Sequence, residues 1–192
     1  MFNEILDGLL LGDGCLIKRS LNARYSHSCK HKEYLEWLQR YFEDNGISVT
    51  PKIYQKNEGR GTYYQMQSRV NPILTTQYER WYLNKKKTVP QDIELTPLSV
   101  LHWYIGDGGL DSDKGYLRQI SLAAHSFSYN ERQILVDKLN KLGFKASNRK
   151  NGLICIAKSS INSFLNWIGV SPVESYNYKW DTNKYQSKQP KY

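Results

Sequence analysis

Residues 6–14 read LDGLLLGDG, an apolar segment rich in leucine and glycine that ends in Gly-Asp-Gly. This pattern predicts a buried helix over residues 3–12. Asp13 would then lie at the C-terminal end of the helix, where the helix dipole already places partial negative charge. A carboxylate is electrostatically unfavourable at this position unless another group compensates its charge.

The composition favours a nucleic-acid partner. The 192 residues include 27 Lys and Arg, 18 Asp and Glu and 15 Tyr, with a formal net charge of +9. A basic protein rich in aromatic side chains is typical of nucleic-acid binding, although an AT-rich genome also raises Lys, Asn, Ile and Tyr. The sequence shows no signal peptide and no apolar run of membrane-spanning length. The odd number of cysteines matches neither a zinc site nor a disulfide framework, so we expect an intracellular protein without membrane contact.

The chain reads as two copies of one pattern. In the first half, residues 1–83, we expect helices over 3–12, 32–46 and 72–83, and strands over 15–19, 24–30, 49–55 and 63–70. Gly59 and Gly61 lie in the turn between the last two strands. Residues 84–95 form the expected linker.

The second half, residues 96–192, repeats this order. We expect helices over 96–109, 128–143 and 160–168, and strands near Leu110 and over 116–125, 144–149 and 153–157. Thr96 is the expected N-cap of the first helix, and Ser128 with Glu131 forms a capping box for the second. Asn151-Gly152 predicts a hairpin turn. The sequence therefore predicts an α+β fold of two αββαββα halves related by a pseudo-twofold axis.

The segment VLHWYIGDG, residues 100–108, repeats the ending of the first motif. Gly8 and Gly12 lie on one helix face, and Gly106 matches Gly12, so the two helices can pack closely and bring Asp13 and Asp107 together. Two adjacent carboxylates repel each other. A divalent cation such as Mg²⁺ would bind both, together with free carbonyls at the helix ends, and could hydrolyse a phosphodiester. The alternative is that each Asp-Gly merely ends a helix.

Both segments closely resemble the signature of the LAGLIDADG homing endonucleases, in its single-chain, two-motif form. Residues 84–110, NKKKTVPQDIELTPLSVLHWYIGDGGL, resemble the inter-domain stretch of intron-encoded members. Residues 174–180, ESYNYKW, resemble their C-terminal Tyr-Lys segment. The resemblance covers essentially the whole chain.

The resemblance implies a monomeric, site-specific endonuclease that cuts both strands of double-stranded DNA at a long target. Each half would lay a saddle-shaped antiparallel sheet on the DNA, and the paired motif helices would join the halves. Carried onto this chain, the resemblance implies that Asp13 and Asp107 bind the metal together with the carbonyls of Gly12 and Gly106. The expected metal is Mg²⁺, with Mn²⁺ as a substitute. Lys87 and Lys179 are the expected active-site lysines.

The sequence departs from the signature at two places. His102 stands where the first motif glycine belongs, and we expect it to be a packing or buried polar residue. Leu11 and Ile105 occupy a position at which the signature has Asp, but that position is not the metal ligand.

Alternating polar side chains predict the DNA-facing side of the sheets. In the first half they are Arg24, Ser26, Ser28, Lys30, Tyr63, Gln65, Gln67 and Arg69. In the second half they are Gln119, Ser121, His125, Lys145, Ser147 and Arg149. Lys30 and His125 end their strands near the motifs and are candidates to border the active site. A solvated sheet face would alternate in the same way.

Two other functions fit the sequence. The chain could be an RNA-splicing maturase that binds its own intron RNA, or a non-cleaving DNA-binding protein of the same fold. Loss of a motif acid would favour either of them, and both acids are present. An intein is disfavoured because no splicing-domain sequence surrounds the nuclease.

Overall fold

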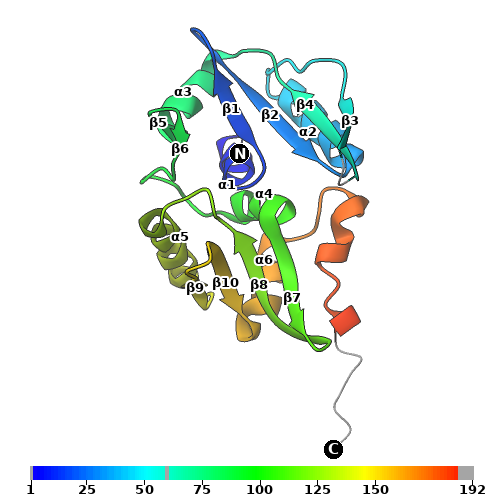
Figure 1. Ribbon diagram of the computed structural model, residues 1–192, viewed down its shortest axis with the longest axis vertical. Coiled ribbons are helices and arrows are strands. Elements are labelled where there is room, and N and C mark those ends of the chain that lie inside the picture. The colour runs from blue at the N-terminus through cyan, green and yellow to red at the C-terminus, as the bar shows by residue number, and fades with distance from the viewer. Residues whose placement is uncertain (1, 59–60, 186–192) are drawn as a thin grey trace, which may run out of the picture.

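The computed structural model describes residues 2–58 and 61–185. Its two halves lie at opposite ends of the molecule, and α1 (Phe2–Leu11) and α4 (Pro97–Asp107) meet side by side between them (Figure 1). No helix among the described residues is long and apolar enough to cross a membrane.

The two halves share one topology. The first half continues after α1 with β1 (Cys15–Lys18), β2 (Ala23–Cys29), α2 (Lys32–Asp44), β3 (Tyr54–Glu58), β4 (Gly61–Gln67) and α3 (Pro72–Trp81). The second continues after α4 with β7 (Gly108–Asp113), β8 (Tyr116–Ala123), α5 (Tyr129–Lys141), β9 (Ala146–Asn148), β10 (Leu153–Ala157) and α6 (Ile161–Ile168). The antiparallel sheets have the matching orders β1-β2-β4-β3 and β7-β8-β10-β9, which confirms the predicted repeat.

Local signals behave as the sequence predicts. Thr96 and Ser128 cap α4 and α5, each within a capping box. Gly152 has a positive φ of 87° in the turn before β10, a conformation that favours glycine. The turn at Gly59 lies outside the described residues.

Several element boundaries differ from the predictions. The strand expected from residue 49 begins at Tyr54, because Pro51 has no amide hydrogen and separates β3 from an isolated bridge at Val49. The strands expected over 63–70 and 144–149 are shorter, at Gly61–Gln67 and Ala146–Asn148. The helix expected to reach residue 83 ends at Trp81.

A hairpin follows α3 and extends into the expected linker. It pairs β5 (Tyr82–Leu83) with β6 (Lys86–Lys87). Asn84 and Lys85 both have positive φ, at 50° and 65°, as a tight two-residue hairpin turn requires. Two short 3₁₀ helices, η2 (Glu174–Lys179) and η3 (Asn183–Tyr185), follow α6.

Backbone-to-backbone contact joins α1 to α4. A Cβ atom on Gly8 would lie only 2.1 Å from the carbonyl oxygen of Ser99, and one on Gly12 would lie 3.6 Å from the Cα atom of Gly106. Larger side chains at Gly8 would push the helices apart, so the glycines of the first motif set the helix separation.

His102 does not disturb this contact, because its side chain turns toward α2. Its Nδ1 lies 2.6 Å from the hydroxyl oxygen of Tyr34, and its ring stacks on Trp37 with 5.2 Å between the ring centres. His102 is 2% exposed, so it is the buried polar packing residue that the sequence predicts.

Asp7 anchors α1 to the end of α3. Its buried carboxylate accepts hydrogen bonds from Arg80 Nη1 at 2.6 Å and from Trp81 Nε1 at 2.8 Å. Arg80 also pairs with the exposed Asp92, at 3.0 Å from Nε to Oδ1. Leu101 occupies the position of Asp7 in the second motif, so this anchor exists only in the first half.

Replacing Asp7 with alanine should lower the free energy of unfolding by about 2 kcal/mol, because the buried indole N–H of Trp81 loses its acceptor and the partly buried Arg80 loses one of its partners. Asp92→Ala should cost less than about 1 kcal/mol, since that pair is exposed. Urea denaturation of both variants measures the two effects. Equal losses would contradict the anchoring role of Asp7.

Two buried histidines predict acid sensitivity. Burial lowers the pKa of His27 to about 4 and that of His102 to about 3. Both are neutral in the folded protein at pH 5, whereas unfolded histidine gains a proton below about pH 6.5. Stability should therefore fall by several kcal/mol between about pH 6.5 and pH 4. His102→Gln should flatten this dependence in denaturation measurements, and an unchanged slope would argue against it.

Candidate functional site

The two motif acids lie next to each other where α1 and α4 end. Asp13 follows the last turn of α1, and Asp107 is the last residue of α4. A Cβ atom on Gly106 would lie 3.3 Å from the Asp13 amide nitrogen and 3.6 Å from its Oδ2. Asp13 therefore packs directly against the end of the opposite motif helix, as the sequence predicts.

Both acids are poorly compensated in the absence of a cation. Burial, and after it the neighbouring Asp13 charge, raise the pKa of Asp107 to about 7, against the opposing effect of Lys87 and Lys179. Surrounding protein also raises the pKa of Asp13, although solvent reaches its carboxylate, and the same two lysines partly offset this rise. The site therefore disfavours two negative charges at once.

Each lysine binds the C-terminal carbonyls of one motif helix. Lys87 Nζ donates to the carbonyl oxygens of Gly12 at 3.2 Å and Gly14 at 3.1 Å. Lys179 Nζ lies within hydrogen-bonding distance of four carbonyl oxygens at and just beyond the C-terminal end of α4, those of Tyr104 at 3.1 Å, Ile105 at 2.6 Å, Gly106 at 3.4 Å and Gly108 at 2.7 Å, and shares its three N–H groups among them. Cations are favourable at helix C-termini, and the two arrangements match about the pseudo-twofold axis.

Burial lowers the pKa of both lysines, that of Lys179 to about 8. The nearby Asp13 and Asp107 charges oppose this effect at both lysines. Lys179 therefore remains mostly protonated at neutral pH and supplies positive charge beside the acids.

The donor set fits a hard divalent cation. Two carboxylates repel each other at the ends of two helices, and the carbonyl oxygens of Gly12 and Gly106 each have a second lone pair besides the one that a lysine uses. Across residues 2–58 and 61–185, no three His, Cys, Asp or Glu side chains gather as a metal-binding group. Water and phosphate oxygens would have to complete the coordination.

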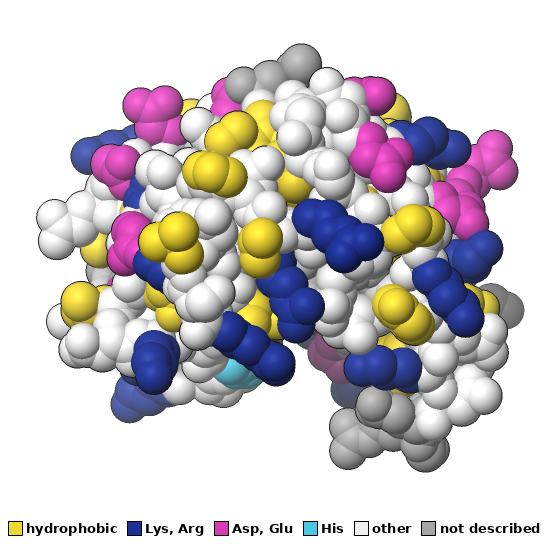
Figure 2. Space-filling view, turned by 90° about the horizontal axis from the view of Figure 1, so that it is seen from above, with side chains coloured by type: hydrophobic (Ala, Val, Ile, Leu, Met, Phe, Trp, Pro, Cys, Tyr) yellow, Lys and Arg dark blue, Asp and Glu magenta, His cyan; other side chains and the backbone are white. Residues whose placement is uncertain are grey.

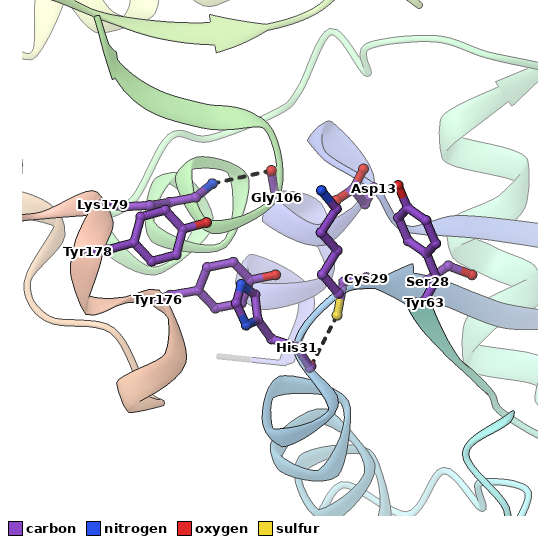
Figure 3. A pocket seen from close by; sticks show the side chains of 10 residues that line it. Asp13, Ser28, Cys29, His31, Tyr63, Gly106, Tyr176, Tyr178 and Lys179 are labelled. Carbon is purple, nitrogen blue, oxygen red and sulfur yellow. Dashed lines mark hydrogen bonds between the residues drawn. The ribbon is translucent and has the colours of Figure 1, made fainter. Parts of the chain in front are cut away.

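A pocket of about 230 Å³ opens beside Asp13 (Figure 3). Asp13, Gly106 and Lys179 form one side of it, and the remaining lining residues are Ser28, Cys29, Lys30, His31, Tyr63, Tyr176 and Tyr178. Three residues predicted to face DNA, Ser28, Lys30 and Tyr63, thus lie next to a motif acid. Sequence reasoning missed His31, Tyr176 and Tyr178, although both tyrosines belong to the ESYNYKW segment.

The first sheet brings its predicted DNA-facing residues together. Register places Ser26 opposite Gln67 and Ser28 opposite Gln65, and Gln65 Nε2 donates to Ser26 Oγ at 3.1 Å. Lys30 Nζ lies 5.8 Å from the ring centre of Tyr63. Two further predicted residues lie on or beside this face, Arg24 on β2 and Arg69 beyond the end of β4. The sequence did not predict Tyr54 and Lys56 on β3, which pair with Gln65 and Tyr63.

The second sheet carries an acid that sequence reasoning missed. Asp111 on β7 pairs with Gln119 on β8, accepts a hydrogen bond from Gln119 Nε2 at 3.1 Å and accepts another from Ser121 Oγ. It therefore shares the face that Gln119 and Ser121 were predicted to form.

The other predicted residues of this half lie around the sheet. Ser147 pairs with Cys155, whereas Lys145 and Arg149 flank β9. His125 lies beyond β8 against the Gly152 turn, since a Cβ on Gly152 would lie 2.3 Å from its Nδ1.

The molecule is hollowed along one side. Figure 2 looks along its long axis and shows a hollow between two lobes, with Lys and Arg side chains at its border. Such a basic concave surface suits a polyanion.

Two curated proteins are similar to this chain in sequence. The chain is 30% identical over 142 residues to an uncharacterized protein of Methanocaldococcus jannaschii, covering 71% of this chain. It is 29% identical over 161 residues to the cytochrome b mRNA maturase bI2 of Debaryomyces hansenii, covering 78% of this chain. The matches span 54% and 60% of those relatives' own lengths.

Solved structures share the fold. The homing endonuclease I-WcaI, bound to its DNA recognition sequence, superposes with a TM-score of 0.79 at 24% identity and covers 92% of this chain and 84% of its own. I-DmoI in complex with DNA and Mn superposes with a TM-score of 0.54 at 16% identity, over 88% of this chain and 97% of its own.

The profile of the LAGLIDADG DNA endonuclease family matches residues 3–164, from the start of the first motif helix to α6. That span includes both Gly-Asp-Gly helix ends and both sheets. The chain therefore belongs to the LAGLIDADG DNA endonuclease family.

Proposed function

We propose that the chain is a divalent-metal-dependent, site-specific endonuclease that cuts both strands of double-stranded DNA and acts as a monomer. The observation that carries this proposal is the paired arrangement of Asp13 and Asp107 beside Lys87 and Lys179. Family membership supports it, and so do the DNA complexes of I-WcaI and of I-DmoI with Mn.

In this proposal Asp13, Asp107 and the carbonyls of Gly12 and Gly106 hold the metal, with Mg²⁺ as the natural ion and Mn²⁺ as a substitute. A bound Mg²⁺ would polarise the scissile phosphate and lower the pKa of attacking water. Lys87 and Lys179 place positive charge where negative charge develops on each phosphate. Because one acid and one lysine lie at the end of each motif helix, each set serves one strand.

The two sheet faces would hold the flanking DNA. Arg, Lys, Gln and Asn side chains read base edges in the major groove, whereas Ser and Tyr suit phosphates. The sheets lie on both sides of the paired helices, so one chain can contact a long target without a second copy.

A second candidate is RNA-splicing maturase activity. The D. hansenii relative, a cytochrome b mRNA maturase, favours it. RNA binding would need the basic concave surface but not Asp13 and Asp107. The following cleavage experiment therefore separates the two functions.

Wild-type protein should cut members of a randomised duplex library in the presence of Mg²⁺. Asp13→Asn and Asp107→Asn should each slow at least one strand cut by about 100-fold or more, since each removes a metal ligand. Cleavage is read by sequencing the cut ends. Normal double-strand cutting by either variant would refute the assigned role, and specific intron-RNA binding without any DNA cutting would favour the maturase.

Metal should stabilise the protein through the two acids. The pKa of Asp107 is about 7 in the folded protein, compared with 3.8 for an ordinary aspartate. Stability of the metal-free protein therefore falls as the pH rises from about 4 to 7, and at pH 8 the ionised Asp107 destabilises the fold. Asp107→Asn should therefore raise the metal-free free energy of unfolding by about 1–2 kcal/mol. It should also abolish stabilisation by added Mg²⁺, which in wild type reaches about 2.7 kcal/mol at a hundred times Kd.

Thermal and urea denaturation at pH 8, with and without Mg²⁺, measure both effects. Asp113→Asn, at an exposed pair with Arg118, is the matched control and should change neither. A destabilised Asp107→Asn protein that still responds to Mg²⁺ would contradict the metal site.

A further inference from the structure

Each of the two lysines lies on a short segment that belongs to one half and contacts the other. The first strap, residues 84–89, follows α3 and carries Lys87 on β6. The second strap, residues 174–180, follows α6 and carries Lys179 at the end of η2. Each lysine caps the motif helix of its own half, α1 for Lys87 and α4 for Lys179.

The first strap is attached to the second half at the start of α5. The Val89 amide, two residues after Lys87, donates to Glu131 Oε1 at 2.9 Å. The other oxygen of Glu131 accepts the Ser128 amide at 2.7 Å in the capping box, so the carboxylate is held from both sides. Lys87 Nζ also lies 5.8 Å from the ring centre of Phe127.

The second strap is attached to the first half in the matching way, at the start of α2. The Ser175 amide donates to Glu33 Oε2 at 3.2 Å. The Tyr176 ring lies against His31, with 4.4 Å between the ring centres, and against Tyr34 at 5.3 Å. Figure 3 shows His31 and Tyr176 side by side, with Lys179 reaching Gly106 beyond them.

We propose that Glu131 and Glu33 are positioning residues, which hold the straps so that Lys87 and Lys179 reach their helix ends. A lysine side chain has many rotamers, so its ammonium group stays in one place only if its backbone is held. Glu131 of the second half thereby positions Lys87 at the end of α1, and Glu33 of the first half positions Lys179 at the end of α4. The consequence for cutting rests on the proposed endonuclease function, whereas the consequence for lysine position does not.

Lysine reactivity tests the positioning without any cutting. Reductive methylation of the metal-free protein, read by peptide mass spectrometry, should modify Lys87 about five- to ten-fold faster in Glu131→Ala than in wild type, with Lys179 unchanged. Glu33→Ala should give the reverse pattern. The control Ser128→Ala weakens the cap of α5 but leaves the Val89 bond, and Glu36→Ala changes an exposed α2 residue that pairs with Lys32. Neither control should raise the reactivity of Lys87 or Lys179.

Strand-resolved cleavage tests the consequence. On a duplex selected from the library and labelled on each strand, Glu131→Ala should lower kcat for the strand that Lys87→Met slows, with little change in KM. Glu33→Ala should do the same for the Lys179→Met strand. Glu131→Gln retains an oxygen that can accept the Val89 amide and should restore most of the lost rate.

The outcomes separate the two proposals. Unchanged Lys87 reactivity in folded Glu131→Ala protein, or equal slowing of both strands, would overturn the positioning role. A wild type that cuts no duplex while the strap variants still show the lysine-specific pattern would support the positioning role and refute the endonuclease function.

Discussion

The close backbone contact between α1 and α4 is the constraint on which the rest of this structure depends. Gly8 rests on the Ser99 carbonyl, and Gly12 faces Gly106, so the two helices end side by side. That geometry aligns two helix C-termini and places a carboxylate at each. The resulting concentration of negative charge creates the need for cations, and the two lysines and the proposed metal answer it.

The two lysines compensate part of this charge by binding main-chain carbonyls. They neutralise the helix ends, which leaves Asp13 and Asp107 without a direct lysine partner among the bonds that the described residues form. Burial raises the pKa of Asp107 to about 7 and lowers that of Lys179 to about 8, because both groups have lost part of their contact with water. In the proposed endonuclease function, a divalent cation would supply the remaining positive charge at this site.

The pseudo-twofold repeat is close in topology but not in chemistry. Asp7 anchors α1 to Arg80 and Trp81, whereas Leu101 stands at the same place in α4. His102 replaces a glycine and packs on α2 through Tyr34 and Trp37. Asp111 places a carboxylate on the predicted DNA-facing side of the second sheet, where it binds Gln119. The two halves therefore share a backbone plan while their surroundings differ.

Much of this protein follows from its sequence alone. Periodicity and capping residues located the helices and the two Gly-Asp-Gly endings located the acids, because these signals are local in the chain. Lys87 and Lys179 were expected only from the resemblance to the family. The boundaries at Pro51 and in the β5–β6 hairpin were less predictable. Each depends on the conformation of one or two residues, namely the missing amide hydrogen of Pro51 and the positive φ of Asn84 and Lys85, and not on a repeating pattern. Only the tertiary structure decided that Asp7 binds Arg80, that Lys179 binds four carbonyls, and that Tyr176 and His31 share a pocket with Asp13. These contacts join residues far apart in sequence, and their formation depends on how the two halves dock, which no local pattern encodes.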